Sequence, residues 1–261
     1  MERLRALKIK DSLSVTTKVL LNCDMGESYG SWTMGDDEAV MEWVDMANVA
    51  CGFHASDPHV MSKTIKLANH YNTRVGAHPG YQDLVGFGRR SIPHSMKEIT
   101  ELVCYQVGAL KALCQHHGTQ LHYVKPHGAL YNDMMANTQI FNAVSEAVSG
   151  FGIPLMILST ANNQKFLDIA DNYDLPLLLE AFADRAYLNN GQLAPRSLSG
   201  SVYTHQDDIY NQIMQIVNYG SVTTIEGERL EIEADTICVH GDNPQSIALI
   251  KRISQDINAI R

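Results

Sequence analysis

Ionisable side chains recur directly after short apolar runs of this sequence. The segments that follow the runs are residues 22–27, 51–57, 76–81, 125–132, 180–185 and 240–242, and most of them include a glycine. Histidine is a common ligand for borderline metals and the usual general base near neutral pH. Carboxylates complete a metal sphere or activate water. The pattern therefore indicates metal binding or acid–base chemistry, provided that the fold brings these segments together.

Four of the eleven histidines fall in these segments, namely His54, His78, His127 and His240. One histidine at a strand end is more often structural than functional, but four at separate strand ends are not readily explained by chance. Lys125 precedes a proline in the same kind of segment, and a buried lysine is rare unless it is paired, so we favour a functional role. Arg89 and Arg90 could clamp a carboxylate or phosphate, or could form a surface pair.

Seven short runs predict the strands that must position these side chains. The runs are mostly apolar rather than alternating, as expected for strands buried on both faces, and they cover residues 19–22, 47–50, 74–77, 121–125, 155–158, 177–181 and 236–240. Helix signals lie between them. Asp57 and Asn243 each precede a proline at a first helical position, although Asp57 could equally have a functional role. Ser95 opens a capping box, and further helices are expected over 36–44, 138–148, 162–172 and 205–219.

Strand–helix alternation over the whole length predicts a parallel α/β architecture. About seven units suit a (β/α) barrel, whose strands all open their carboxyl ends on one face. An open doubly wound sheet is the alternative. A hairpin of 222–225 and 229–232 is expected before the last strand. Residues 1–17 read as an extension outside the fold, without the apolar core of a secretory signal, and residues 18–261 as a single barrel domain.

Composition narrows the function classes. The 261 residues are 45% hydrophobic, which argues against a mainly disordered chain, and the formal charge of −9 argues against a nucleic-acid partner. No apolar run is long enough to span a membrane. Five cysteines without a C-x-x-C pair predict neither disulfides nor a zinc knuckle and fit the reducing cytoplasm. Motifs of P-loop, dinucleotide-binding and serine-hydrolase sites are also missing from the sequence.

Taken together, the segments after the strands resemble the LamB/YcsF family. The matching motifs are NCDMGE (22–27), ACGFH (50–54), GAHP (76–79), GFGRR (86–90), KPHGALYN (125–132), EAFADR (180–185) and VHGD (239–242). They occur in order from about residue 19 to the carboxyl end, so the resemblance covers over nine tenths of the chain. Ser56 stands where the family pattern has glycine.

The resemblance implies an irregular (β/α)7 barrel of the glycoside hydrolase/deacetylase type. It also implies a hydrolase that opens the lactam 5-oxo-L-proline to L-glutamate, coupled to ATP hydrolysis. The chain would then work with two partner subunits, B and C, of a 5-oxoprolinase, and ATP would bind with their help.

The same resemblance suggests roles for individual residues. Asp24 or Glu27 is the expected base that activates water, and the catalytic set is Asp24, Glu27, Lys125, Asp184 and His240. The expected substrate-binding residues are Arg89, Arg90, Asn132 and Arg185. By analogy with deacetylases of related fold, a divalent metal would be held by Asp24, His54, His78 and His127.

Two other functions fit the same residues. The first is a metal-dependent deacetylase that acts on a small acylated compound without ATP. The second is a non-catalytic subunit that binds lactams, which the density of ionisable residues disfavours because pure binding sites need few of them.

Overall fold

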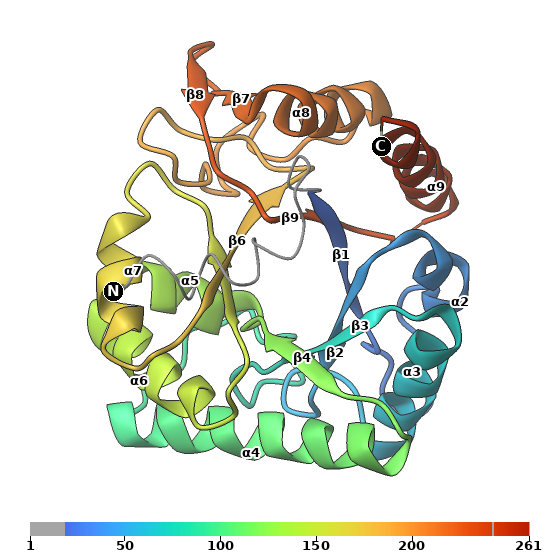
Figure 1. Cartoon of the computed structure of the whole chain (residues 1–261), viewed down its shortest axis with the longest axis vertical. Coiled ribbons are helices and arrows are strands. Elements are labelled where there is room, and N and C mark those ends of the chain that lie inside the picture. The colour runs from blue at the N-terminus through green and yellow to red at the C-terminus, as the bar shows by residue number, and fades with distance from the viewer. Residues whose placement is uncertain (1–18, 242, 261) are drawn as a thin grey trace.

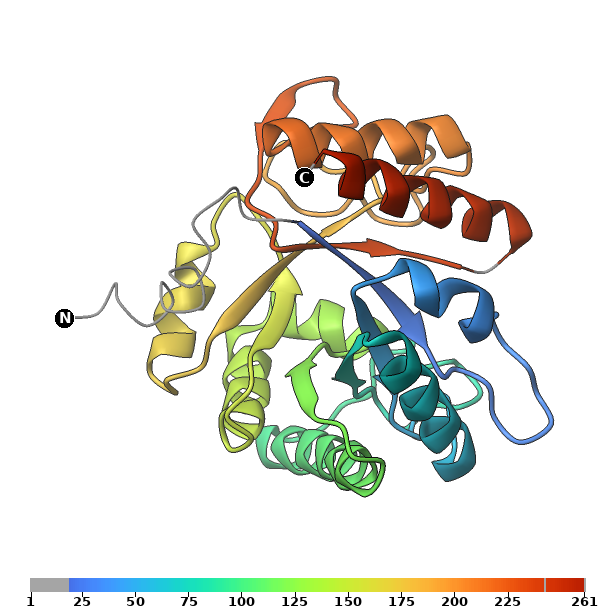
Figure 2. The same cartoon turned by 45° about the vertical axis from the view of Figure 1, so that its right-hand side comes forward.

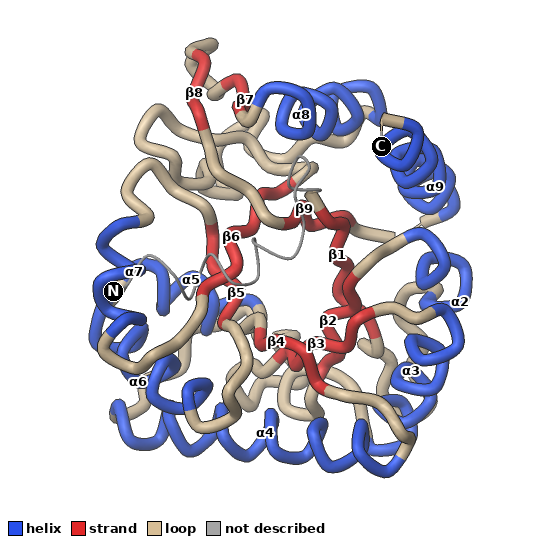
Figure 3. Tube along the Cα trace, in the orientation of Figure 1, coloured by secondary structure: helices blue, strands red, loops and turns tan. Residues whose placement is uncertain are grey.

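The computed structural model describes residues 19–241 and 243–260, so the expected extension at 1–17 lies outside the described residues. Seven strands close into a barrel in the order β1 (Leu20–Met25), β2 (Met46–Ala50), β3 (Arg74–His78), β4 (Leu121–Val124), β5 (Leu155–Leu158), β6 (Leu177–Phe182) and β9 (Thr236–Val239). All neighbouring pairs are parallel. Figure 3 shows the strands as an inner ring with helices outside. The predicted α/β barrel is confirmed over the open sheet.

All seven predicted strands are present, with shifts of at most a few residues at their ends. The largest difference is in β1, which was expected to end at Asn22 and continues to Met25. Asp24 is therefore part of a barrel strand rather than of the loop that follows it. Side chains two apart in a strand share a face, so Asn22 and Asp24 both point the same way, toward the barrel interior.

The helices between the strands are α3 (Pro58–Tyr71), α4 (Met96–His116), α5 (Gly128–Ala136), α6 (Thr138–Ser149), α7 (Gln164–Asp171), α8 (Gln206–Tyr219) and α9 (Pro244–Ala259). Asp57 and Asn243 cap α3 and α9 as expected, and Ser95 and Glu98 form the predicted capping box of α4. The expected helix over 36–44 is shorter, because α2 (Asp37–Val40) gives way to a 3-10 turn, η1 (Met41–Trp43). Helix α5 was not predicted.

Layers of side chains fill the barrel. In the interior, Met46, Tyr123 and Met156 pack together and against Leu20 and Leu178. These five side chains form an apolar plug. Polar groups lie nearer the carboxyl ends of the strands. Because the plug closes one end, a ligand reaches the polar layer from the other end, as is usual for such barrels.

The predicted hairpin is also present as antiparallel strands β7 (Ser221–Thr223) and β8 (Arg229–Glu231). It follows α8 at the edge of the molecule, and α8 and α9 lie side by side on the same flank (Figures 1 and 2). Among residues 19–241 and 243–260, no helix has the length and apolar character needed to cross a bilayer.

Candidate active site

A pocket of about 200 Å³ opens at the carboxyl ends of the barrel strands. It collects eight of the predicted site residues from six different segments of the chain: Asp24, His78, Arg89, Lys125, His127, Asn132, Arg185 and His240. Positions more than 200 residues apart in the sequence thus share one cavity. The convergence on which the sequence interpretation depends is present.

Lys125 lies at the base of this pocket between two carboxylates. Its side chain is 4% exposed, and its Nζ lies 2.7 Å from Glu180 Oε1 and 3.2 Å from Asp24 Oδ1. Burial disfavours the ammonium, but Asp24 and Glu180 outweigh that effect and hold the pKa of Lys125 well above its ordinary value. Lys125 therefore stays a cation at the base of the pocket.

Asp24 is held as an anion by the same arrangement. Burial alone would raise the pKa of its carboxyl, yet His78 and Lys125 outweigh it and keep that pKa well below the ordinary value. Asn48 Nδ2 donates a hydrogen bond of 2.8 Å to Asp24 Oδ1, and the hydroxyl of Tyr123 donates to Asn48 Oδ1 at 2.6 Å. This buried chain of donors fixes the direction in which the carboxylate points.

Tyr123 occupies its position because residue 76 in the neighbouring strand is glycine. A Cβ on Gly76 would overlap the ring of Tyr123. The missing side chain on β3 thus makes room for the aromatic ring from β4, and the ring carries the hydroxyl to Asn48.

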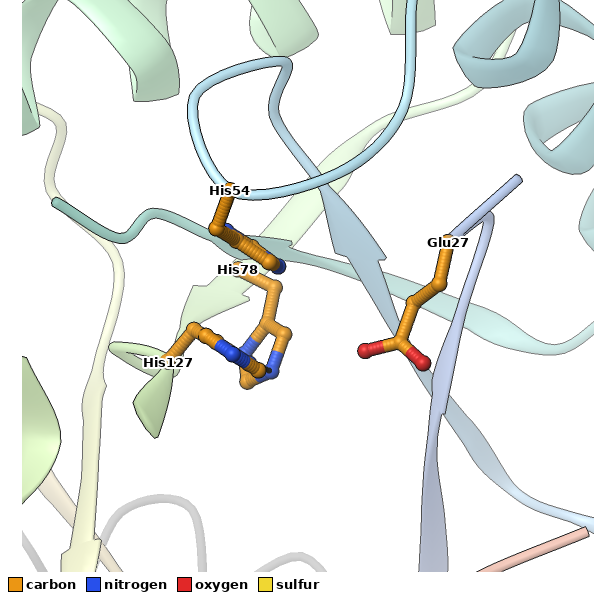
Figure 4. Close-up of side chains that lie close together, drawn as sticks. All are labelled: Glu27, His54, His78 and His127. Atoms are coloured by element: carbon orange, nitrogen blue, oxygen red, sulfur yellow. Dashed lines mark hydrogen bonds between the residues drawn. The ribbon is translucent and has the colours of Figure 1, made fainter. Parts of the chain in front are cut away.

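Three buried imidazoles form one wall beside the pocket. His54 comes from the loop after β2, His78 ends β3 and His127 precedes α5 (Figure 4). The rings of His54 and His127 stack with centroids 3.7 Å apart. Burial lowers the pKa of His127 to about 3, with repulsion from His78 adding to the effect, and burial likewise lowers the pKa of His54 well below its ordinary value. Both rings are neutral near pH 7.

Glu27 approaches the imidazoles from the end of β1, and Figure 4 shows its carboxylate directed toward them. One ligand atom from each of Glu27, His54, His78 and His127 lies within 4.8 Å of the others. Asp24 is not a member of this group, although its Oδ2 is 3.4 Å from His78 Nε2. The expected metal set and the observed cluster therefore share the three histidines and differ in the carboxylate.

Four predicted residues lie outside the pocket lining: Glu27 and His54, which belong to the imidazole cluster, and Arg90 and Asp184. Arg90 forms a multiply bonded ion pair with Asp83, and the Arg90 side chain is 63% exposed. The loop of residues 86–90 therefore directs Arg89, rather than Arg90, into the pocket. Asp184 lies behind His240, with 3.8 Å between Asp184 Oδ1 and His240 Nε2.

Sequence reasoning missed several members of the site. Glu180 is fully buried and accepts a 2.9 Å hydrogen bond from the hydroxyl of Tyr131, in addition to its ion pair with Lys125. The signal that could have identified Glu180 is a carboxylate inside an otherwise apolar predicted strand. Arg196 adds a third arginine to the pocket wall from a loop that carries no recognisable motif. Cys238 Sγ lies 3.2 Å from Lys125 Nζ, and burial raises the pKa of this thiol.

The fold and the site define a closed (β/α) barrel with an ion-paired, imidazole-lined pocket at the carboxyl ends of its strands. The chain belongs to the LamB/YcsF family, whose model matches residues 19–260.

Named relatives are similar over nearly their full length. The 5-oxoprolinase A subunit of Vibrio vulnificus strain CMCP6 is 70% identical over 240 residues, which is 92% of this chain and 97% of that protein. A 5-oxoprolinase A subunit of Pseudomonas aeruginosa is 49% identical over 93% of this chain and 98% of its own length. The crystal structure of the lactam utilization protein from Thermus thermophilus matches with a TM-score of 0.86 and 38% identity, covering 93% of this chain and 97% of that chain.

Proposed function

We propose that this chain is the A subunit of an ATP-dependent 5-oxoprolinase that hydrolyses 5-oxo-L-proline to L-glutamate together with subunits B and C. The observation that carries the proposal is the pairing of ionised Asp24 with cationic Lys125 in a pocket walled by arginines. The names of relatives at 49–70% identity support the same reaction. Free thiols at all five cysteines fit a cytoplasmic protein.

The substrate is a small anion with a lactam ring. Arg89 and Arg185 line the pocket and are our candidates for the substrate carboxylate, because guanidinium groups make bidentate, charge-assisted hydrogen bonds. Asn132 offers an amide that can both donate to and accept from the lactam group. These contacts would place the lactam carbonyl above Lys125 and Asp24.

Hydrolysis of the lactam needs activation because its amide is resonance-stabilised. Transfer of the γ-phosphoryl group of ATP to the amide oxygen releases ADP and makes the carbon electrophilic. Water then attacks that carbon while Asp24 takes its proton, and the adduct breaks its C–N bond to give an open-chain acyl phosphate. His240 is our candidate to protonate the leaving nitrogen. A second water converts the acyl phosphate to glutamate and phosphate, and Lys125 stabilises the developing negative charge on oxygen.

Reconstitution tests this function. The purified chain is assayed with ATP and 5-oxo-L-proline, with and without subunits B and C, and glutamate is measured by a coupled dehydrogenase. We expect glutamate only when ATP and all three subunits are present. Glutamate formation without ATP, or calorimetric binding of 5-oxo-L-proline with no turnover in any mixture, would contradict the proposal; the second result would favour a lactam-binding subunit.

The cluster of three histidines and a carboxylate favours a second candidate, a metal-dependent deacetylase. This activity needs neither ATP nor partner subunits. Incubation of the chain with a divalent metal and acylated sugars, followed by measurement of acetate, separates the two functions. Release of acetate would support the deacetylase, and its absence alongside ATP-dependent glutamate formation would exclude it.

A further inference from the structure

The hydrogen bonds of His78 and His127 fix which nitrogen of each ring carries a proton. His78 Nδ1 lies 2.7 Å from the backbone oxygen of Lys125, and His127 Nε2 lies 2.8 Å from the backbone oxygen of Phe87. A carbonyl oxygen only accepts hydrogen bonds, so both of these nitrogens are N–H donors. In neutral rings the remaining nitrogens, His78 Nε2 and His127 Nδ1, then carry lone pairs.

These two lone-pair nitrogens face one another at 3.0 Å. When both rings are neutral, neither nitrogen can donate to the other, so the contact is repulsive unless a positive charge lies between them. That charge is either a metal ion or a proton on His78 Nε2, which would then face His127 and, at 3.4 Å, Asp24 Oδ2. Two nitrogen ligands that lie about 2.0–2.1 Å from the same first-row metal ion, in neighbouring coordination positions, are about 3 Å apart. The two histidine nitrogens have a similar separation. A backbone carbonyl holding the outer nitrogen is also the usual support for a metal-binding imidazole.

His54 supplies an independent observation. Its side chain is 1% exposed, and neither ring nitrogen has a hydrogen-bond partner within the described part of the chain. A buried polar atom without a partner costs about 1–3 kcal/mol. One of the His54 ring nitrogens lies within 4.8 Å of the ligand atoms of Glu27, His78 and His127, where a cation would satisfy it.

Two glycines make room for the histidine rings. A Cβ on Gly80 would lie 2.7 Å from His54 Nδ1, closer than real contacts allow. A Cβ on Gly88 would crowd both His54 and His127, and Gly88 also has a φ of +63°, which favours glycine. The loops on this side of the barrel are therefore shaped around the imidazoles.

The carboxylate of the cluster is Glu27 rather than Asp24. Glu27 contributes an oxygen within 4.8 Å of the three histidine ligand atoms. Asp24 Oδ1 is already engaged by Asn48 and Lys125. Glu27 would therefore bind the cation, whereas Asp24 would keep its contacts with Asn48 and Lys125 in the pocket.

We propose that His54, His78, His127 and Glu27 bind one first-row divalent metal ion, with Zn²⁺ or Co²⁺ as suitable probes. Imidazole nitrogens with a single carboxylate suit such borderline ions better than Mg²⁺ or Ca²⁺, which prefer all-oxygen sites. Metal binding is independent of the proposed hydrolase activity and is measured without it.

The test is titration of the full, chelator-treated chain with Zn²⁺ by calorimetry and with Co²⁺ by visible absorption. We expect one equivalent of either ion and a raised Tm, with no binding of Mg²⁺ under the same conditions. Loss of an outer partner typically weakens metal binding about 10–100-fold, so loss of a ligand in Glu27→Gln or His54→Ala should weaken it at least about 100-fold. His54→Gln serves as a second variant if His54→Ala fails to fold.

Two control variants make the assignment specific. His59→Ala removes an exposed histidine from the same region and should leave the stoichiometry and the Co²⁺ spectrum unchanged. Asp24→Asn should also retain one equivalent of Co²⁺. Absence of stoichiometric Zn²⁺ and Co²⁺ binding would overturn the proposal and leave a shared proton between His78 and His127. Loss of the ion in Asp24→Asn with retention in Glu27→Gln would overturn the ligand set.

Discussion

Lys125 and Glu180 form an ion pair of 2.7 Å in the barrel interior, where the Glu180 side chain is completely buried and that of Lys125 nearly so. Removal of one partner from such a pair leaves an uncompensated charge, which costs about 3–5 kcal/mol. Tyr131 donates a hydrogen bond to the same carboxylate. The pair is therefore a structural as well as an electrostatic feature of the site.

Glu180→Gln should lower the free energy of unfolding by a few kcal/mol, because it removes one of the two carboxylates that hold the buried Lys125 ammonium. Urea denaturation measures the change. The matched control is Glu38→Gln, which breaks the exposed 3.0 Å pair with Lys63 and should cost about 0–1 kcal/mol. Equal losses in the two variants would contradict the account.

Gly76→Ala should destabilise the barrel by about 1–3 kcal/mol or more, because the added Cβ collides with the ring of Tyr123. Gly108→Ala is the opposite case. Residue 108 lies within α4, where a Cβ meets nothing within 4 Å, so the substitution should stabilise the helix by about 0.5–1 kcal/mol. Thermal denaturation of both variants reads out the signs, and a neutral Gly76→Ala would argue against the close packing of β3 on β4.

Ser56→Gly should stabilise the chain by about 1 kcal/mol. Ser56 has a φ of +74°, a left-handed conformation that costs a non-glycine residue about 1–2 kcal/mol. Ser145→Gly, in the middle of α6, provides the comparison and should lower the Tm. A loss of stability in Ser56→Gly would show that the serine side chain outweighs the strain.

The metal-free chain should lose stability as the pH falls below about 6.5. The pKa of His127 is lowered to about 3 in the folded chain by burial and by His78, so the unfolded chain binds more protons between these two pH values. Each such histidine then contributes up to about 1.4 kcal/mol per pH unit. Urea denaturation in the presence of chelator at pH 7, 6 and 5 should show a shallower fall for His127→Gln. The exposed His205→Gln should keep the original slope, and identical slopes for all three proteins would count against neutral buried imidazoles.

Local sequence signals were sufficient for most of the fold. Strand runs, the proline caps after Asp57 and Asn243 and the capping box at Ser95 each act within a few residues, and each was confirmed. Helix α5 was missed because it begins at Gly128, inside the motif segment 125–132, and has no capping side chain.

The site was less predictable because it depends on the facing of individual side chains. The three histidines and Lys125 stood out by type and position. The sequence interpretation placed Asp24 with the three histidines, whereas Glu27 joins them in the structure, and the facing of these two carboxylates depends on where β1 ends. Arg196 and the exclusion of Arg90 depend on loop conformation and on the ion pair with Asp83, neither of which has a sequence pattern.

The most direct test of the central claim is glutamate formation by the reconstituted three-subunit enzyme that carries Asp24→Asn. Asparagine keeps the shape of the side chain but removes the charge that faces Lys125 and accepts the proton of water, so we expect the rate to fall by at least about 10²–10³, the usual effect of losing one catalytic electrostatic group. Lys63→Ala, on the exposed face of α3, should keep the wild-type rate. Full turnover by Asp24→Asn would contradict the proposed role of this pocket.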